Sequence, residues 1–304
     1  MAFTHYNSGN NSEKVKTIPI TDGNFQKRVI YSIDLNPLGL DDIVIALGEV
    51  SGTNQFRKGR NPNVMFVGQI LLCDSPNSTV GSEITEANGF NITRNMNHGT
   101  IVKIGTKQII QSDLSRNYLN FISYAGCTQA IKNDTLRINQ DYGRLSAIKI
   151  NNNMNIKHYN SGNASERVKS IPVAKTSNQI KKNVIFSIEI TENLSIGDVL
   201  LVTSEYQATN DLGFNTSIVS QLILTNSQHA TTGLEITEAN GYNITPNMHH
   251  GYLVKNGTIE MTSRSINKKY VNLISFSKSN AAKPGDSLTI DNDYGRLSII
   301  HFKN

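Results

Sequence analysis

The sequence predicts an all-β protein made of two tandem homologous β-sandwich domains of jelly-roll type. Three observations support this. The chain repeats itself along its length, its apolar residues gather in short runs rich in Val, Ile, Thr, Tyr and Phe, and Asn, Ser and Thr fill the segments between. β-Branched and aromatic residues favour strands, whereas Asn and Ser favour turns. No window shows the 3.6-residue apolar period of a helix.

The repeat is an internal duplication. The segment "HYNSGNNSEKVKTIPI" from His5 matches "HYNSGNASERVKSIPV" from His158, and "DYGRLS" at 141–146 returns at 293–298. The spacing between the copies changes only in polar stretches, which indicates surface loops on a common scaffold. Each copy of about 150 residues has the size of an independent domain. The predicted domains are therefore 1–150 and 151–304.

Each copy contains the same series of expected strands. They cover 29–35, 41–50, 63–72, 118–125 and 143–150 in the first copy, and 184–190, 197–206, 215–224, 270–277 and 295–302 in the second. Side chains of differing polarity alternate in several of these runs, as in strands with one face in a core. Counting weaker runs between them, we expect six to eight strands per copy, as in a sandwich.

One polar segment is kept especially closely. "EITEANGFNITRNMNHG" at 83–99 returns as "EITEANGYNITPNMHHG" at 235–251, with fourteen of seventeen positions identical. A structural interpretation is that Asn-Gly makes a turn and that Glu and Asn bond backbone groups. The alternatives are a Ca²⁺ or sugar site and a subunit contact. The candidate residues are Glu83, Glu86, Asn88, Asn91 and His98, with Glu235, Glu238, Asn240, Asn243, His249 and His250 in the second copy.

The net charge of +5 is spread along the chain. Its densest basic cluster is Arg57, Lys58 and Arg60, in a loop that is longer in the first copy. We interpret this as a solvated loop, with a polyanion contact as the alternative. Nucleic-acid binding is not expected, because such proteins usually concentrate basic charge on one face.

Catalytic and metal signatures are missing from the sequence. There is no Gly-x-Ser-x-Gly elbow, no phosphate-binding loop and no zinc motif, and two cysteines make no disulfide framework. We therefore predict a protein that is not an enzyme and has no metal or other cofactor, with Ca²⁺ as a weak alternative. The amino terminus lacks a secretory signal and no apolar run reaches membrane-spanning length, so we expect synthesis in the cytoplasm.

Two functions remain. The first is a structural subunit of a virion, appendage or surface assembly, acting as a homo-oligomer, with a trimer or ring favoured. The second is a lectin-like carbohydrate-binding module with one site per repeat, Ca²⁺-dependent in one version, whose two copies supply avidity for a glycan. If the copies differ in function, we expect the difference at Arg57–Arg60 and at His249-His250.

Overall fold

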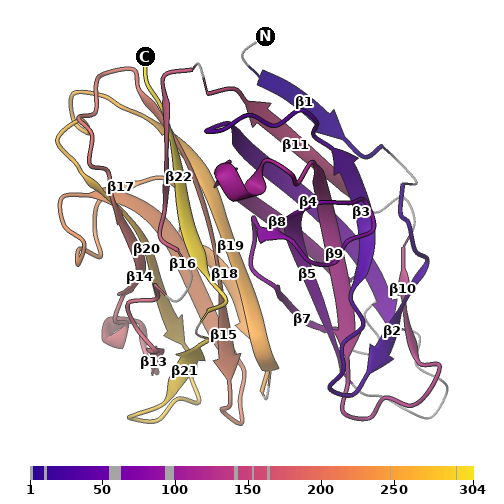
Figure 1. Ribbon diagram of the computed structural model, residues 1–304. Helices are drawn as coiled ribbons and strands as arrows, with labels where there is room; N and C mark the ends of the chain where they lie inside the picture. The colour runs from indigo at the N-terminus through magenta and orange to yellow at the C-terminus, as the bar shows by residue number, and fades with distance from the viewer. Residues whose placement is uncertain are drawn as a thin grey trace. The chain divides into compact units, whose positions relative to one another are not determined.

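The computed structural model describes residues 3–9, 12–54, 63–92, 99–139, 143–152, 154–162, 165–246, 248–291 and 293–304, without the side chains of 248–250. The chain divides into two compact units, Met1–Met154 (unit 1) and Asn155–Asn304 (unit 2) (Figure 1). Over the described ranges, the only helices are two 3₁₀ turns, η1 (Gln111–Asp113) and η2 (Ser177–Gln179). The all-β prediction is confirmed.

The strands of unit 1 are β1 (Phe3–Asn7), β2 (Thr17–Thr21), β3 (Arg28–Asp34), β4 (Ile43–Asn54), β5 (Val64–Cys73), β6 (Ser82–Glu83), β7 (Asn88–Ile92), β8 (Gly99–Gln108), β9 (Tyr118–Gly126), β10 (Thr135–Ile138) and β11 (Arg144–Ile150). Those of unit 2 are β12 (Ile156–Asn160), β13 (Ser170–Ala174), β14 (Asn183–Glu189), β15 (Val199–Asn210), β16 (Thr216–Thr225), β17 (Leu234–Glu235), β18 (Asn240–Ile244), β19 (Met248–Glu260), β20 (Tyr270–Lys278), β21 (Ser287–Ile290) and β22 (Arg296–Phe302). The part of each unit that is described has eleven strands, more than the six to eight expected. Strands such as β6, with two residues, are too short to stand out as apolar runs.

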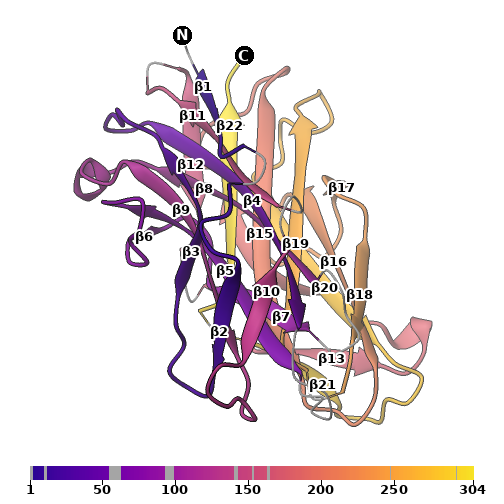
Figure 2. The same cartoon turned by 90° about the vertical axis from the view of Figure 1, so that its right-hand side faces the viewer.

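Strand pairing gives each unit a jelly-roll sandwich. In unit 1, the first sheet has the order β1-β11-β4-β8 and the second has β3-β9-β5-β7. Unit 2 repeats this order with β12-β22-β15-β19 and β14-β20-β16-β18. This is the arrangement of eight-stranded jelly rolls. The additional strand β2 pairs with β10 and also with β9, so it links the two sheets at one edge (Figure 2).

Each unit has its own apolar core, and the two cores are filled differently. In unit 1 the ring of Phe121 lies over Gly48 and Gly68; a Cβ on Gly48 would come within 2.4 Å of that ring. In unit 2 the Phe121 position holds Leu273, and the buried Tyr206 replaces a valine of unit 1. Because interiors are close-packed, a larger side chain at one position requires smaller ones around it. The two copies have the same fold, but large and small side chains occupy different positions in their cores.

Candidate functional site

The repeated polar segment begins with a carboxylate that is bonded within each unit. Glu83 on β6 accepts a hydrogen bond of 2.8 Å from the side-chain amide of Gln69 on β5. Glu235 on β17 accepts the equivalent bond of 2.7 Å from Gln221 on β16. The first candidate carboxylate of each copy therefore ties a two-residue strand to the centre of the second sheet.

Glu86 and Asn88 surround a lysine that sequence reasoning missed. Lys103 on β8 is fully buried, and its Nζ donates to the Glu86 carbonyl oxygen at 2.9 Å and to Asn88 Oδ1. A buried ammonium group is costly unless its protons are bonded. These two candidates thus have a structural task, which is to hold a charged group inside the sandwich.

The same arrangement recurs in unit 2. Lys255 on β19 donates to Asn240 Oδ1 and, at 3.4 Å, to the Glu238 carbonyl oxygen. Burial lowers the pKa of Lys255, because desolvation disfavours its charged form. The sequence signal that could have indicated these two lysines is the pattern Val-Lys-x-Gly-Thr, which occurs at 102–106 and again at 254–258.

The Asn-Gly pair in each segment is not a turn, so that interpretation was wrong. Gly89 lies in β7 and Gly241 in β18, and neither has a positive φ. A Cβ on Gly89 would lie 1.8 Å from the carbonyl oxygen of Phe66, and one on Gly241 would lie 1.8 Å from that of Ile218. Glycine is required here because an adjacent strand backbone passes too close for any side chain.

Other candidates are only partly described. Asn91 is half-buried on β7, facing Met65 of β5. His98 and the basic loop residues Arg57, Lys58 and Arg60 lie outside the described residues, while His249 and His250 lie on β19 with side chains outside the description. A ligand or interface role for these residues stays a prediction.

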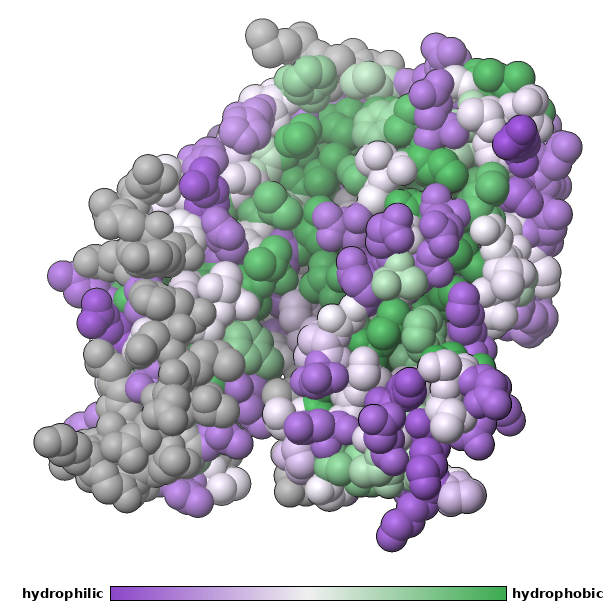
Figure 3. All heavy atoms as spheres, turned by 180° about the vertical axis from the view of Figure 1, so that it is seen from behind, coloured by the Kyte–Doolittle hydropathy of each residue, from purple (hydrophilic) through white to green (hydrophobic). Residues whose placement is uncertain are grey.

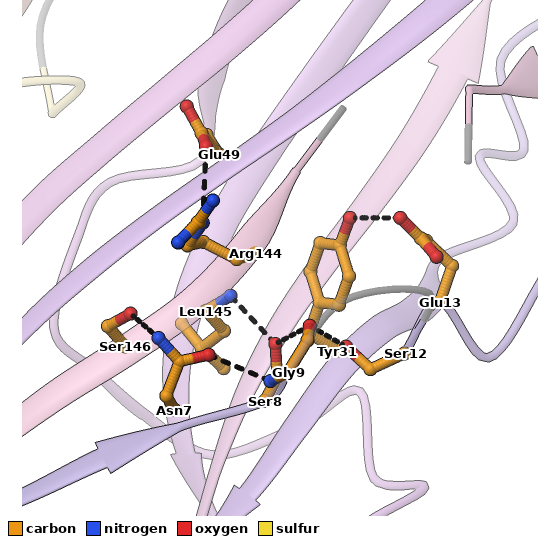
Figure 4. Close-up of polar contacts among 10 residues, drawn as sticks. All are labelled: Asn7, Ser8, Gly9, Ser12, Glu13, Tyr31, Glu49, Arg144, Leu145 and Ser146. Atoms are coloured by element: carbon orange, nitrogen blue, oxygen red, sulfur yellow. Dashed lines mark hydrogen bonds and ion pairs between the residues drawn. The ribbon is translucent and has the colours of Figure 1, made fainter. Parts of the chain in front are cut away.

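The repeated "HYNSGN" segment docks the start of each unit onto its last strand (Figure 4). Asn7 Nδ2 donates to Ser146 Oγ at 3.0 Å, and the Leu145 amide donates to Ser8 Oγ at 3.1 Å. Asn7 Oδ1 also accepts from the amide of Gly9, whose φ of +83° needs glycine. Unit 2 repeats all three bonds at equivalent positions.

Two longer-range contacts stand beside this segment in Figure 4. Arg144, in the repeated "DYGRLS" segment, lies 3.7 Å from Glu49 in an exposed ion pair. The buried Tyr31 hydroxyl donates to Glu13 Oε1 at 2.8 Å. Burial and the neighbouring Glu13 carboxylate raise the pKa of Tyr31. The first contact joins β11 to β4, and the second joins β3 to the segment before β2, both within unit 1.

Unit 2 has a surface groove of about 580 Å³ on the outer face of its second sheet. Two cross-strand rows form its floor. Val219 of β16 faces Phe276 of β20, and Ser217 lies between Asn243 of β18 and Lys278 of β20. The remaining lining residues come from the surrounding loops: Ile180, Phe214, Asn215, Ser279, Asn280 and Ala281. Among the candidate residues that the structure describes, Asn243 is thus the one that lines this groove.

In unit 1 an aromatic ring occupies the corresponding place. Phe25, at the position of Ile180, stacks on Tyr124 with ring centroids 5.3 Å apart. Gly126 stands where unit 2 has Lys278, and a Cβ on it would come within 2.2 Å of the Phe25 ring. Unit 2 has the smaller Ile180 in place of Phe25, so no ring from this position covers the surface of its sheet.

The described residues contain no cluster of His, Cys, Asp or Glu that could hold a metal ion. Cys73 is buried and Cys127 half-buried, and both are free thiols. Burial raises the pKa of Cys73 to about 11, so its thiol is protonated at neutral pH. No helix in the described part is long and apolar enough to cross a membrane.

No protein-family model and no curated protein matches the chain. Several solved structures do. A capsid of infectious bursal disease virus, Gx strain, matches 98% of this chain and 70% of its own at 10% identity and a TM-score of 0.33. A tandem CBM22 domain from Paenibacillus barcinonensis Xyn10C matches 88% of this chain and 82% of its own, with 13% identity and a TM-score of 0.22. N-glycanase F matches 100% of this chain and 96% of its own, with 8% identity and a TM-score of 0.40. None of these similarities is close enough to carry a function to this chain.

Proposed function

We propose that this protein is a structural subunit that associates with copies of itself through the outer face of the first sheet of unit 1. The main support for this proposal is a group of exposed apolar side chains on that face. Leu47 of β4 is 46% exposed, Val102 of β8 is 43% exposed and Ile148 of β11 is 38% exposed. Contiguous apolar patches on a soluble protein mark interaction surfaces.

Strand register makes these residues neighbours. Ile148 pairs with Ile45 on β4, and Leu47, two residues further along the same face, pairs with Ile104 on β8. Val102 follows Ile104 on that face by the two-residue period of a strand. The space-filling view from behind shows hydrophobic residues at the surface with polar residues among them (Figure 3).

The sandwich itself does not require this apolar face. Unit 2 has Thr203 at the position of Leu47 and Asn256 at the position of Ile104, although it keeps Val254 and Ile300 at the positions of Val102 and Ile148. Since the same fold forms with polar residues at two of these positions, Leu47 and Ile104 of unit 1 serve another purpose. Self-association is the purpose that fits a chain with a duplicated scaffold.

The size of the face favours a closed ring over a simple pair. Phe3 of β1, 60% exposed, lies on the same face, because it is two residues from His5, which pairs with Ile148. Full burial of a Val, Leu, Ile or Phe side chain gives about 1.5–3 kcal/mol, so burying the exposed parts of Leu47, Val102, Ile148 and Phe3 contributes about 4 kcal/mol together. Association costs about 4–15 kcal/mol. One contact is therefore weak, whereas in a ring this face packs against a different surface of the next copy, so that each copy takes part in two contacts. A trimeric ring would present six sandwiches, which suits a virion shell, an appendage or a surface layer.

The test is the mass of the full chain in solution, measured by light scattering and negative-stain microscopy. We expect a ring, and we expect the double variant Leu47→Thr with Ile104→Asn, which copies unit 2, to be monomeric with unchanged melting. The matched control Ile131→Asn alters an exposed apolar residue of unit 1 in the β9–β10 loop and should leave the ring intact. A wild-type monomer, or a double variant that assembles normally, contradicts the proposal.

A further inference from the structure

We propose that the groove over β16, β18 and β20 binds a neutral sugar residue of a glycan, and that Phe25 closes the corresponding place in unit 1. This inference goes beyond self-association and does not depend on it. The volume of the groove, about 580 Å³, falls within the range of small-ligand sites, about 300–1,000 Å³. The groove lies on the outer face of a sheet, where a longer glycan can continue beyond one bound residue.

The floor of the groove is apolar in the manner that a sugar ring requires. Val219 and the half-buried ring of Phe276 lie side by side as a cross-strand pair. The C–H face of a pyranose is apolar and packs against such a surface. Lys182 Nζ lies 5.9 Å from the Phe276 centroid, and this exposed side chain can move aside when a sugar docks.

Polar groups of the right kind border this floor. Asn243 and Ser217 are cross-strand partners on the outer face, and Asn215 and Asn280 lie at the rim. Amides and hydroxyls both donate and accept hydrogen bonds, which matches the paired donor and acceptor character of sugar hydroxyls. These groups fix orientation, whereas the apolar floor supplies contact area.

The small number of charged residues in the lining favours a neutral ligand. Among the described residues, Lys278 is the one charged residue in the lining, with the exposed Lys182 over Phe276 beside it, and the Lys278 Nζ already donates to Ser177 Oγ at 3.0 Å. None of the described lining residues is a carboxylate, so they offer neither a carboxylate ligand for Ca²⁺ nor an acidic partner for a cationic ligand. The site therefore differs from the Ca²⁺-dependent one considered for the repeated segments.

Unit 1 shows how the site is lost. Its equivalents of Ser217 and Lys278 are Met65 and Gly126, and Phe25 stacks over Tyr124 above them. Of the polar floor row only Asn91 remains, at the position of Asn243, and the Phe25 ring lies over the place of the groove. This divergence gives a blocking variant that the fold is known to accommodate, namely Ile180→Phe with Lys278→Gly.

The test is binding of neutral glycans to the full chain, first on a glycan array and then by saturation-transfer NMR with the free oligosaccharides. We expect a neutral glycan to bind, the blocking double variant to lose binding, and Asn243→Ala to bind about tenfold more weakly, which corresponds to about 1.4 kcal/mol. The matched control Ile196→Phe, at an exposed position of unit 2 outside the groove, should bind normally.

Three outcomes overturn the inference. They are binding of no neutral glycan by the wild type, undiminished binding by the blocking variant, and undiminished binding by Asn243→Ala. If the blocking variant fails to fold, Asn243→Ala still decides, because it removes only an amide from the surface. Loss of the ring in the assembly experiment would leave glycan binding intact, so the two proposals fail separately.

Discussion

Asn120 is the residue whose replacement tests the structural account most directly. Its side chain is fully buried on the outer face of the second sheet of unit 1, under the loop between β5 and β6. Nδ2 donates to the carbonyl oxygens of Ser75 and Ser78, both at 2.9 Å, and Oδ1 accepts from Ser32 Oγ at 2.6 Å. The amide therefore fastens the β5–β6 loop to the second sheet. Asn272 makes the same three bonds in unit 2, within 0.1 Å.

Asn120→Asp replaces the side-chain amide nitrogen with an oxygen and leaves the volume of the side chain almost unchanged. It replaces both N–H donors with an oxygen that faces two carbonyl oxygens. Each lost hydrogen bond costs about 0.5–1.5 kcal/mol, and the unpaired groups left behind add to this, so we expect at least about 3 kcal/mol at neutral pH. For a unit of this size that lowers the melting temperature by about 6–12 °C.

The assay is thermal unfolding followed by calorimetry, with hydrogen exchange read by mass spectrometry over the 74–80 loop. Exchange in this loop should rise strongly in Asn120→Asp and stay unchanged in unit 2. Asn77→Asp, at an exposed position of the same loop, keeps its acceptor for Lys14 and should have little effect. The reasoning is refuted if Asn120→Asp melts like the wild type.

Two further predictions concern single polar contacts. Tyr31→Phe removes the donor to Glu13 and copies the Phe186 of unit 2, so it should lower unit 1 stability by about 1.5–3 kcal/mol in urea titration; an unchanged midpoint would contradict the contact. Burial opposes ionisation of Asp198, but bonds from two backbone amides and from His301 outweigh it and lower the pKa of Asp198. Since the folded-state pKa is depressed, this stabilisation is present above the ordinary Asp pKa of about 3.9 and is lost as pH falls through and below that value. Asp198→Asn should therefore reduce the melting temperature at neutral pH and flatten its decline below about pH 4; an identical decline in both proteins would contradict this.

The fold was predictable because its signals are local or repeated. Alternating side chains and two aligned copies indicate strands and domains without any knowledge of contacts. Gly89 was misread because its constraint is the carbonyl oxygen of Phe66, twenty-three positions earlier, which becomes a neighbour only when β5 and β7 pair. Lys103 was missed for the same reason. A lysine in a strand normally indicates a solvent face, and only the folded chain brings Asn88 to it.

The duplication also changes where function should be sought. A position kept in both copies satisfies a demand common to both, and what the copies demonstrably share is the sandwich. The buried Asn120 and Asn272 show this, since every bond of one is repeated by the other. Positions that differ on outward faces are free of that demand. Leu47 against Thr203 and Phe25 against Ile180 are of this kind, although the strands of the two units pair in the same way. The described Glu83, Asn88, Glu235 and Asn240 side chains of the near-identical segments therefore serve the scaffold, whereas Asn243 lines the proposed groove. The differences between the copies are where we propose that a partner or a glycan acts.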